Sequence, residues 1–200
     1  MSALDVLTGR RRTDQRRWAD TASLLELCEL TLGWLNGEVR WCPGYTGPVD
    51  VDDVPGLREC LVAANERGFL TVDSQQGFEG PGAGGTWVQH AAVTGFAGDR
   101  LATRLVRAAR HDGYEAYVWD SGMDPITVTD WNGLSHTAYG WVDATTISRY
   151  LFPGVGRSAL REVTAVAQIT IVDPDPGFND LWPWLTGALR VFPARIGGRS

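Results

Sequence analysis

The sequence predicts a single α+β domain, in which a mixed or antiparallel sheet of about five or six strands is packed against helices. Its 200 residues suit one ordinary domain with a sizeable core. Segments with helical and with strand-like spacing follow one another in mixed order. The dipeptide Asn132-Gly133 also separates two strand-like runs, which is the pattern of a tight antiparallel hairpin.

Three parts of the chain differ in composition. Residues 1–20 contain five arginines and few apolar groups, and we expect them to form a flexible arm. The arm either serves an acidic partner or is a solvated lead-in, and the second interpretation is favoured. Residues 21–191 are expected to form the folded domain, and residues 192–200 a tail that frays.

The first elements follow from apolar spacing. Leucines recur at helical spacing over residues 22–35, where Asp20 or Thr21 is available as the N-cap. Residues 39–45 have the composition of a short strand that leads into a Pro-Gly turn. A second helix is predicted over residues 57–64, preceded by carboxylates that suit the positive end of its dipole.

Gly68 is predicted to end this second helix, because glycine readily takes the positive φ found there. A short strand over residues 69–72 follows. The five glycines of residues 77–85 match neither phosphate-binding pattern, so we expect a flexible connection that serves as a lid over a ligand. The next predicted elements are a strand over 86–96, a helix over 99–113 and a strand over 114–119.

The last part of the chain begins with the predicted hairpin over residues 126–141, in which Asn132-Gly133 supplies both positive-φ positions of a type I′ turn. Further elements are a short helix or bend over 145–152, a loop over 153–156, a buried strand over 163–172 and a closing helix over 181–189.

Composition disfavours several classes of protein. The net charge of -6 disfavours nucleic acid as a partner, and no run approaches the ~20 apolar residues of a membrane span. The 3 cysteines form no C-x-x-C pair, so we expect no disulfide framework or zinc site and a reducing, cytoplasmic setting. The histidines lack the spacing of metal ligands, and no G-x-S-x-G elbow supports a nucleophilic relay of Ser74, His90 and Asp73.

A run of polar side chains follows the strand over residues 69–72. Thr71, Asp73 and Ser74 would lie at the edge of a sheet, where ligands are commonly bound. The alternative is that these hydroxyls only satisfy nearby backbone groups.

Three blocks of sequence resemble a known family. The phrase N-E-R-G-F-L-T-V-D-S-Q-Q over residues 65–76 is followed by G-G-T-W-V-Q-H-A over residues 84–91. Near the C-terminus stand I-V-D-P-D and N-D-L-W, over residues 171–175 and 179–182. Together they resemble the C-terminal regulatory domain of eukaryotic-type methylenetetrahydrofolate reductase over residues 22–190, with 119–162 aligning poorly. That domain binds S-adenosylmethionine and carries no catalysis, and the catalytic barrel of the family is absent here.

The resemblance implies a set of ligand-binding residues. Thr71 and Ser74 match the T-x-x-S motif of the family, and Asp53 falls at the position of an acidic residue that helps to hold S-adenosylmethionine. Asp73 replaces an Asn of the family; it either aids the binding of a cationic ligand or indicates a changed one. Two further threonines of the family have Thr137 and Thr145 as their nearest counterparts, and Trp87 offers an aromatic face for stacking or a cation–π contact.

Three functions remain open at this point. The first is a stand-alone sensor that binds S-adenosylmethionine, or S-adenosylhomocysteine, without consuming it and passes its bound state to a protein partner. The second is a small enzyme that acts on S-adenosylmethionine or a related nucleoside. The third is an interaction module that has lost the ligand. The sequence favours the first.

Overall fold

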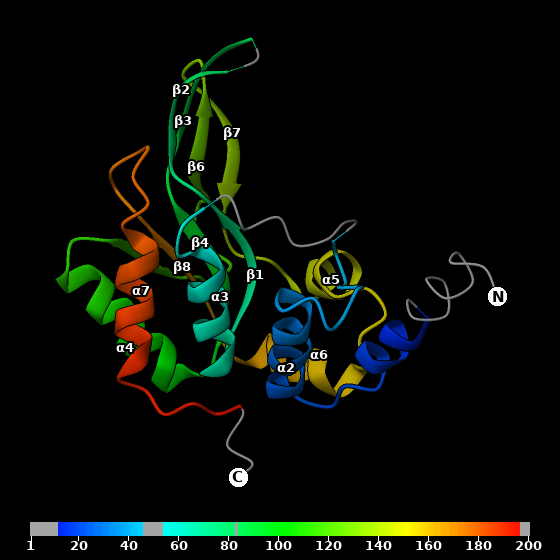
Figure 1. Cartoon of the computed structure of the whole chain (residues 1–200). Helices are drawn as coiled ribbons and strands as arrows, with labels where there is room; N and C mark the ends of the chain where they lie inside the picture. The colour runs from blue at the N-terminus through cyan, green and yellow to red at the C-terminus, as the bar shows by residue number, and fades with distance from the viewer. Residues whose placement is uncertain (1–11, 46–53, 83, 197–200) are drawn as a thin grey trace.

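The computed structural model describes residues 12–45, 54–82 and 84–196, and it confirms the α+β class (Figure 1). In these residues eight strands form two four-stranded antiparallel sheets, where the sequence predicted about five or six strands in one. The helices are α2 (Leu24–Leu35), α3 (Leu57–Glu66), α4 (Asp99–His111), α5 (Ala144–Thr146), the π-helix η1 (Ile147–Leu151), α6 (Arg157–Ala165) and α7 (Leu181–Arg190). The strands are β1 (Phe69–Gln75), β2 (Phe78–Gly82), β3 (Gly85–Gln89), β4 (Ala92–Ala97), β5 (Glu115–Val118), β6 (Ile126–Trp131), β7 (Leu134–Tyr139) and β8 (Ala167–Val172).

The first sheet, in the order β1-β4-β8-β5, forms the body of the protein together with the helices. Helix α3 contacts β1, α4 contacts β5 and β8, and α7 packs against both α3 and α4 (Figure 1). Fully buried side chains such as Phe69, Phe96, Leu105 and Ile169 join these layers. Burial of this apolar surface is the main force that holds the body together.

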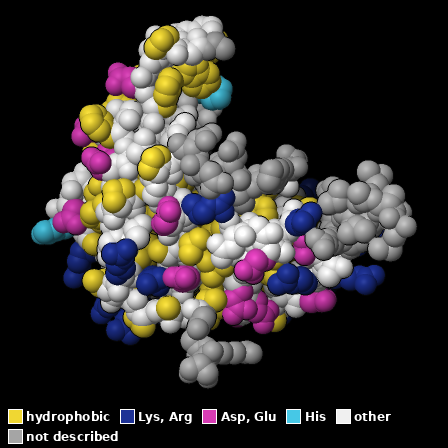
Figure 2. All heavy atoms as spheres, in the orientation of Figure 1, with side chains coloured by type: hydrophobic (Ala, Val, Ile, Leu, Met, Phe, Trp, Pro, Cys, Tyr) yellow, Lys and Arg dark blue, Asp and Glu magenta, His cyan; other side chains and the backbone are white. Residues whose placement is uncertain are grey.

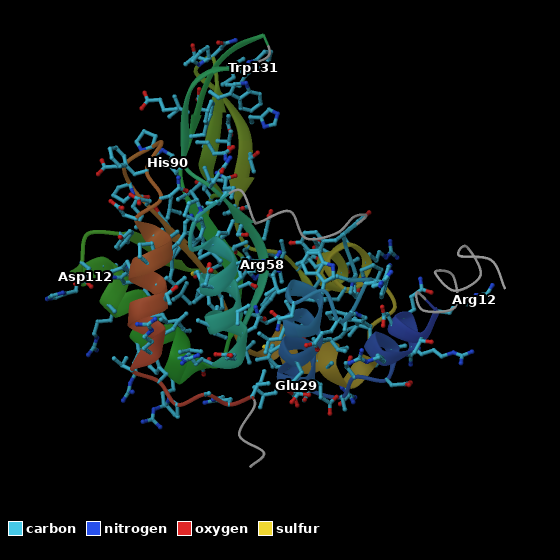
Figure 3. All side chains as sticks on the ribbon, in the orientation of Figure 1. Arg12, Glu29, Arg58, His90, Asp112 and Trp131 are labelled. Atoms are coloured by element: carbon cyan, nitrogen blue, oxygen red, sulfur yellow. The ribbon has the colours of Figure 1, made fainter. Side chains whose placement is uncertain are left out.

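The second sheet, in the order β2-β3-β6-β7, projects from the body as an arm (Figure 1). The predicted hairpin is confirmed within it: β6 pairs with β7, and Asn132 and Gly133 have φ of 54° and 79°. Hydrophobic side chains and a histidine lie along the arm (Figure 2), where Phe78 and Leu134 are exposed. Trp131 lies near the tip and His90 where the arm meets the body (Figure 3).

The side chain of Gln75 joins the two sheets. Its Nε2 donates to the backbone oxygens of His90 and Val128, both at 2.9 Å, and its Oε1 accepts from the Thr129 hydroxyl at 3.1 Å. His90 and Ala91 are where the chain leaves β3 and enters β4. The prediction of one strand over residues 86–96 is therefore wrong, because the chain changes sheets at this point and Gln75 occupies the gap.

Strand β1 contains a bulge at Val72. Thr71 pairs with Gly95 and Asp73 pairs with Thr94, so Val72 has no partner in β4. A Cβ atom on Gly95 would lie 2.1 Å from the carbonyl oxygen of Leu70. Because real Cβ contacts are never so short, glycine is required for the two strands to approach each other here.

Three further predictions of secondary structure are wrong. Residues 39–45 form no strand, because the Asp14 side chain accepts from Arg40 N–H and the Trp18 indole donates to Trp41 C=O, which replaces a sheet ladder. The glycine-rich connection forms β2, which pairs with β3 in a hairpin instead of forming a loose lid. The strand predicted over residues 163–172 begins only at Ala167, since α6 extends to Ala165.

The described ends of the chain also differ from expectation. Residues 12–19 are helical and bury Trp18 completely. This part of the N-terminal segment, which was expected to be flexible, therefore belongs to the body. Residues 192–196, the described part of the expected fraying tail, lie against the body, where Arg195 and Ile196 donate backbone N–H groups to Glu66 C=O. Ser23, and not Asp20 or Thr21, caps α2 by accepting from Glu26 N–H.

Because β1 and β4 approach closely beside the bulge, adding one methyl group at Gly95 should destabilise the fold. We expect Gly95→Ala to lower the free energy of unfolding by about 1–3 kcal/mol, because the new methyl group collides with the Leu70 carbonyl. The matched control is Gly187→Ala in α7, where a Cβ meets nothing within 4 Å. This variant should gain about 0.5–1 kcal/mol from helix propensity. Urea denaturation of the three proteins measures both effects, and equal stability of the two variants would contradict the role of Gly95.

Candidate functional site

A cavity of about 440 Å³ lies between α2, β1, η1 and the loop before residue 46. Its volume is within the range of pockets that bind small molecules. One side is apolar, with Leu35, Leu61 and Phe152, and the other carries the polar run of β1. The cavity therefore combines a hydrophobic interior with a few polar groups, which is the usual composition of a ligand site.

The bulge at Val72 brings Thr71 and Ser74 to the same face of β1. In a regular strand, residues three apart point to opposite faces. Here Asp73 takes the pairing position that Val72 would hold, so Ser74 returns to the face of Thr71. Thr71, Asp73 and Ser74 all line the cavity.

Aromatic side chains form a second part of the cavity wall, next to β1. The rings of Trp34 and Tyr45 are 4.7 Å apart between centroids, and both line the cavity together with Tyr150. The Tyr45 hydroxyl donates to the backbone oxygen of Val72 at 2.5 Å. This bond ties the loop before residue 46 to the bulge and keeps the aromatic wall close to the polar run.

A π-helical turn closes the cavity on a third side. In η1 the Phe152 N–H donates to Ile147 C=O at 2.9 Å, and such turns are frequent at functional sites. Gly44 lies against this turn with a φ of 79°, and a Cβ atom there would be 3.0 Å from the Leu151 carbonyl oxygen. Glycine therefore permits the close approach of loop and turn.

Asp73 carries the negative charge of the site. Asp73 is exposed at the rim, while its carboxylate accepts a hydrogen bond from the Tyr139 hydroxyl and is close enough to Tyr45 for their charges to interact. Desolvation raises the pKa of Asp73, against the hydrogen bonds that it accepts from Ser74 N–H at 2.8 Å and from the Tyr139 hydroxyl. Burial and the Asp73 charge in turn raise the pKa of both Tyr45 and Tyr139. The carboxylate is thus held where a cationic ligand would relieve its desolvation.

The structure brings together only part of the predicted site. Trp87 lies in the arm, where its ring is 6.2 Å from Trp131, and it does not line the cavity. Thr137 pairs with Thr129 in the arm, and Thr145 lies in α5 before η1; neither lines the cavity. Asp53 lies outside the described residues.

Sequence reasoning expected an aromatic residue at the site but assigned it to Trp87, and it did not identify Trp34, Tyr45 or Tyr139. Trp34 follows the apolar spacing of α2 and is not distinguished from a core residue. Tyr45 follows the Pro43-Gly44 dipeptide, which indicates a turn but not a pocket. Tyr139 reaches Asp73 from the end of β7, which only the tertiary fold reveals.

Other kinds of site find less support. The Nδ1 atom of His90 lies 2.9 Å from the backbone oxygen of Asp173, so the imidazole is engaged away from Ser74. In the described residues no group of three or more His, Cys, Asp or Glu side chains could hold a metal ion. Of the helices that the structure describes, none has the length and apolar character needed to cross a bilayer.

The fold and the cavity define an α+β domain with a pocket of small-molecule size. Residues 13–192 match a family described as a domain of unknown function, DUF6919, and the chain belongs to this family. No curated protein matches the chain.

The raised pKa of Asp73 has a consequence for stability. A carboxylate whose pKa is higher in the folded state destabilises the fold once it ionises, so its penalty is absent in acid and appears as the pH rises through its folded pKa. We therefore expect Asp73→Asn to raise the free energy of unfolding at neutral pH and to have little effect in acid. Asn still offers an oxygen to Ser74 N–H.

Asp143 provides the control, because its pKa is shifted in the direction opposite to that of Asp73. Its pKa is lowered because it accepts the Thr146 backbone N–H at 2.7 Å as the N-cap of α5. Its contribution is present above the unfolded pKa and is lost as the pH falls, so Asp143→Asn should lower stability at neutral pH. Urea denaturation at neutral and acidic pH tests both, and a loss of stability in Asp73→Asn at neutral pH would contradict the desolvation of Asp73.

Proposed function

We propose that this protein binds S-adenosylmethionine reversibly in the cavity beside β1 and does not consume it. The observation that supports this proposal most directly is the convergence of Thr71, Asp73 and Ser74 on one aromatic-walled cavity. Thr71 and Ser74 match the T-x-x-S motif of the regulatory domain to which the sequence is similar, and Asp73 replaces an Asn of that domain.

The chemistry of the cavity suits such a ligand. S-adenosylmethionine carries a sulfonium and an ammonium group, and the Asp73 carboxylate supplies a negative charge for one of them. The rings of Trp34 and Tyr45 offer faces for adenine stacking or a cation–π contact. The hydroxyls of Thr71 and Ser74 can bond the polar atoms of the ribose or the amino acid.

A cellular setting and a partner complete the proposal. The thiols of Cys28, Cys42 and Cys60 are buried and unpaired, which fits a reducing cytoplasm. A protein partner would read the bound state. Neither nucleic acid nor a membrane is part of the proposed function.

Calorimetric titration with S-adenosylmethionine and S-adenosylhomocysteine tests the ligand. We expect Ser74→Ala to weaken binding by about 0.5–1.5 kcal/mol, because it removes one hydroxyl from the cavity wall. Thr145→Val and Thr137→Val are matched controls that also remove one hydroxyl each, but outside the cavity. Both should leave the affinity unchanged.

Three results would redirect the proposal. Binding that Thr145→Val weakens and Ser74→Ala does not would place the ligand elsewhere. A new product after incubation with S-adenosylmethionine would indicate an enzyme. Absence of heat and of thermal stabilisation at millimolar ligand would indicate an interaction module.

Binding should also depend on pH through Asp73. Because the raised pKa of Asp73 reflects desolvation of its ionised form, a cationic ligand should bind more tightly above that pKa and release a proton when it binds near it. We expect the affinity for S-adenosylmethionine to fall as the pH is lowered, and Asp73→Asn to remove this dependence. Titrations in buffers of different ionisation enthalpy measure the released proton, and an affinity independent of pH in the unchanged protein would exclude Asp73 as the counter-ion.

A further inference from the structure

Asn65, near the end of α3, is a fully buried polar residue directly behind the cavity. Its Nδ2 donates to the Leu61 backbone oxygen at 2.9 Å and to the Thr71 hydroxyl oxygen at 2.8 Å. Leu61 and Thr71 both line the cavity. The orientation of the amide follows from these bonds, because exchanging its oxygen and nitrogen would set two acceptors against each other at Leu61.

This bond determines which way the Thr71 hydroxyl can point its proton. A threonine hydroxyl has one proton to donate and can accept through its lone pairs. Since Asn65 Nδ2 has no lone pair to offer, the Thr71 oxygen must be the acceptor in this contact. The Thr71 proton is then left for the cavity side, and among the described residues no acceptor for it is recorded.

The second feature of Asn65 is the oxygen of its side-chain amide, although Asn65 itself does not line the cavity. Its Oδ1 is buried and has no hydrogen-bond partner among the described residues. A buried acceptor without a donor is unfavourable, and most buried polar groups in native proteins are paired with the protein or with ordered water. The amide therefore has hydrogen-bond partners for its nitrogen and none for its buried oxygen among the described residues.

From these contacts we propose that Asn65 is a positioning residue that makes Thr71 a hydrogen-bond donor to the ligand. The cavity then selects a ligand with an acceptor atom, such as a ribose oxygen, a ring nitrogen or a carboxylate oxygen, opposite Thr71 and a cationic group opposite Asp73. This inference rests on the proposed function of the same cavity and specifies the polarity of its ligand.

A thermodynamic cycle between Asn65 and Thr71 tests the proposal, with S-adenosylmethionine as the probe in calorimetric titrations. Thr71→Val should weaken binding about two- to ten-fold, and Thr71→Ser, which keeps the hydroxyl, should restore it. Asn65→Ala should weaken binding when Thr71 is present and have no further effect on Thr71→Val, because Asn65 acts only through that hydroxyl.

Asn65→Asp gives a sharper test. Its carboxylate would accept the Thr71 proton and turn it away from the cavity, so binding should weaken at least as much as in Thr71→Val. Because Asn65→Asp buries a charge, Asn65→Ala keeps the cycle complete where the aspartate variant does not fold. Thermal unfolding without ligand reports the stability of each variant separately.

The outcomes separate this inference from the proposed function. If Asn65→Ala weakens binding equally with Thr71 and with Val at position 71, Asn65 acts through the fold alone and the inference is wrong while the ligand stands. Wild-type affinity in a folded Asn65→Asp variant would have the same meaning. If the unchanged protein does not bind S-adenosylmethionine, both the inference and the proposed function are overturned.

Discussion

The candidate site depends on one irregular step in the backbone, the bulge at Val72. Without it, β1 would turn the hydroxyls of Thr71 and Ser74 to opposite faces of the sheet. The bulge is held from three directions: Gly95 lets the Leu70 carbonyl approach β4, Tyr45 bonds the Val72 carbonyl, and Asn65 bonds Thr71. Strand pairing therefore determines which polar groups of β1 face the cavity. The rings of Trp34 and Tyr45 add the aromatic surface against which a ligand would lie.

Local features of the fold were predictable, and features that depend on distant partners were not. Asn132-Gly133 identified its hairpin because the turn conformation is a property of those two residues. The composition of residues 39–45 also favours a strand, but side chains from the helical residues 12–19 occupy two of its backbone groups. Residues 86–96 have unbroken strand character, and only the docking of Gln75 explains why they serve two sheets.

The same division applies to the candidate site. Thr71, Asp73 and Ser74 are neighbours in sequence, so their placement at one strand end could be anticipated, whereas their convergence required the register of β1 against β4. Thr137 and Thr145 were assigned by resemblance in a stretch that aligns poorly, and neither lies at the cavity. Trp34 and Tyr139 reach the site through tertiary packing, for which apolar spacing contains no information.

The way in which the two sheets are joined predicts that the arm and the body differ in local stability. A small cluster of Val128 and Tyr139 from the arm with Ala92 and Val172 from the body strands β4 and β8, together with the amide of Gln75, joins the two sheets. A side-chain bridge constrains less than a continuous strand ladder, so the arm and the body are expected to open as separate cooperative units. Amide protons in the arm would then exchange with solvent through local openings, while those of β4 and β8 wait for global unfolding. Tyr139, the last residue of β7, belongs to the arm and donates a hydrogen bond to Asp73. A ligand bound in the cavity would therefore first slow the exchange of amide protons at this end of β7.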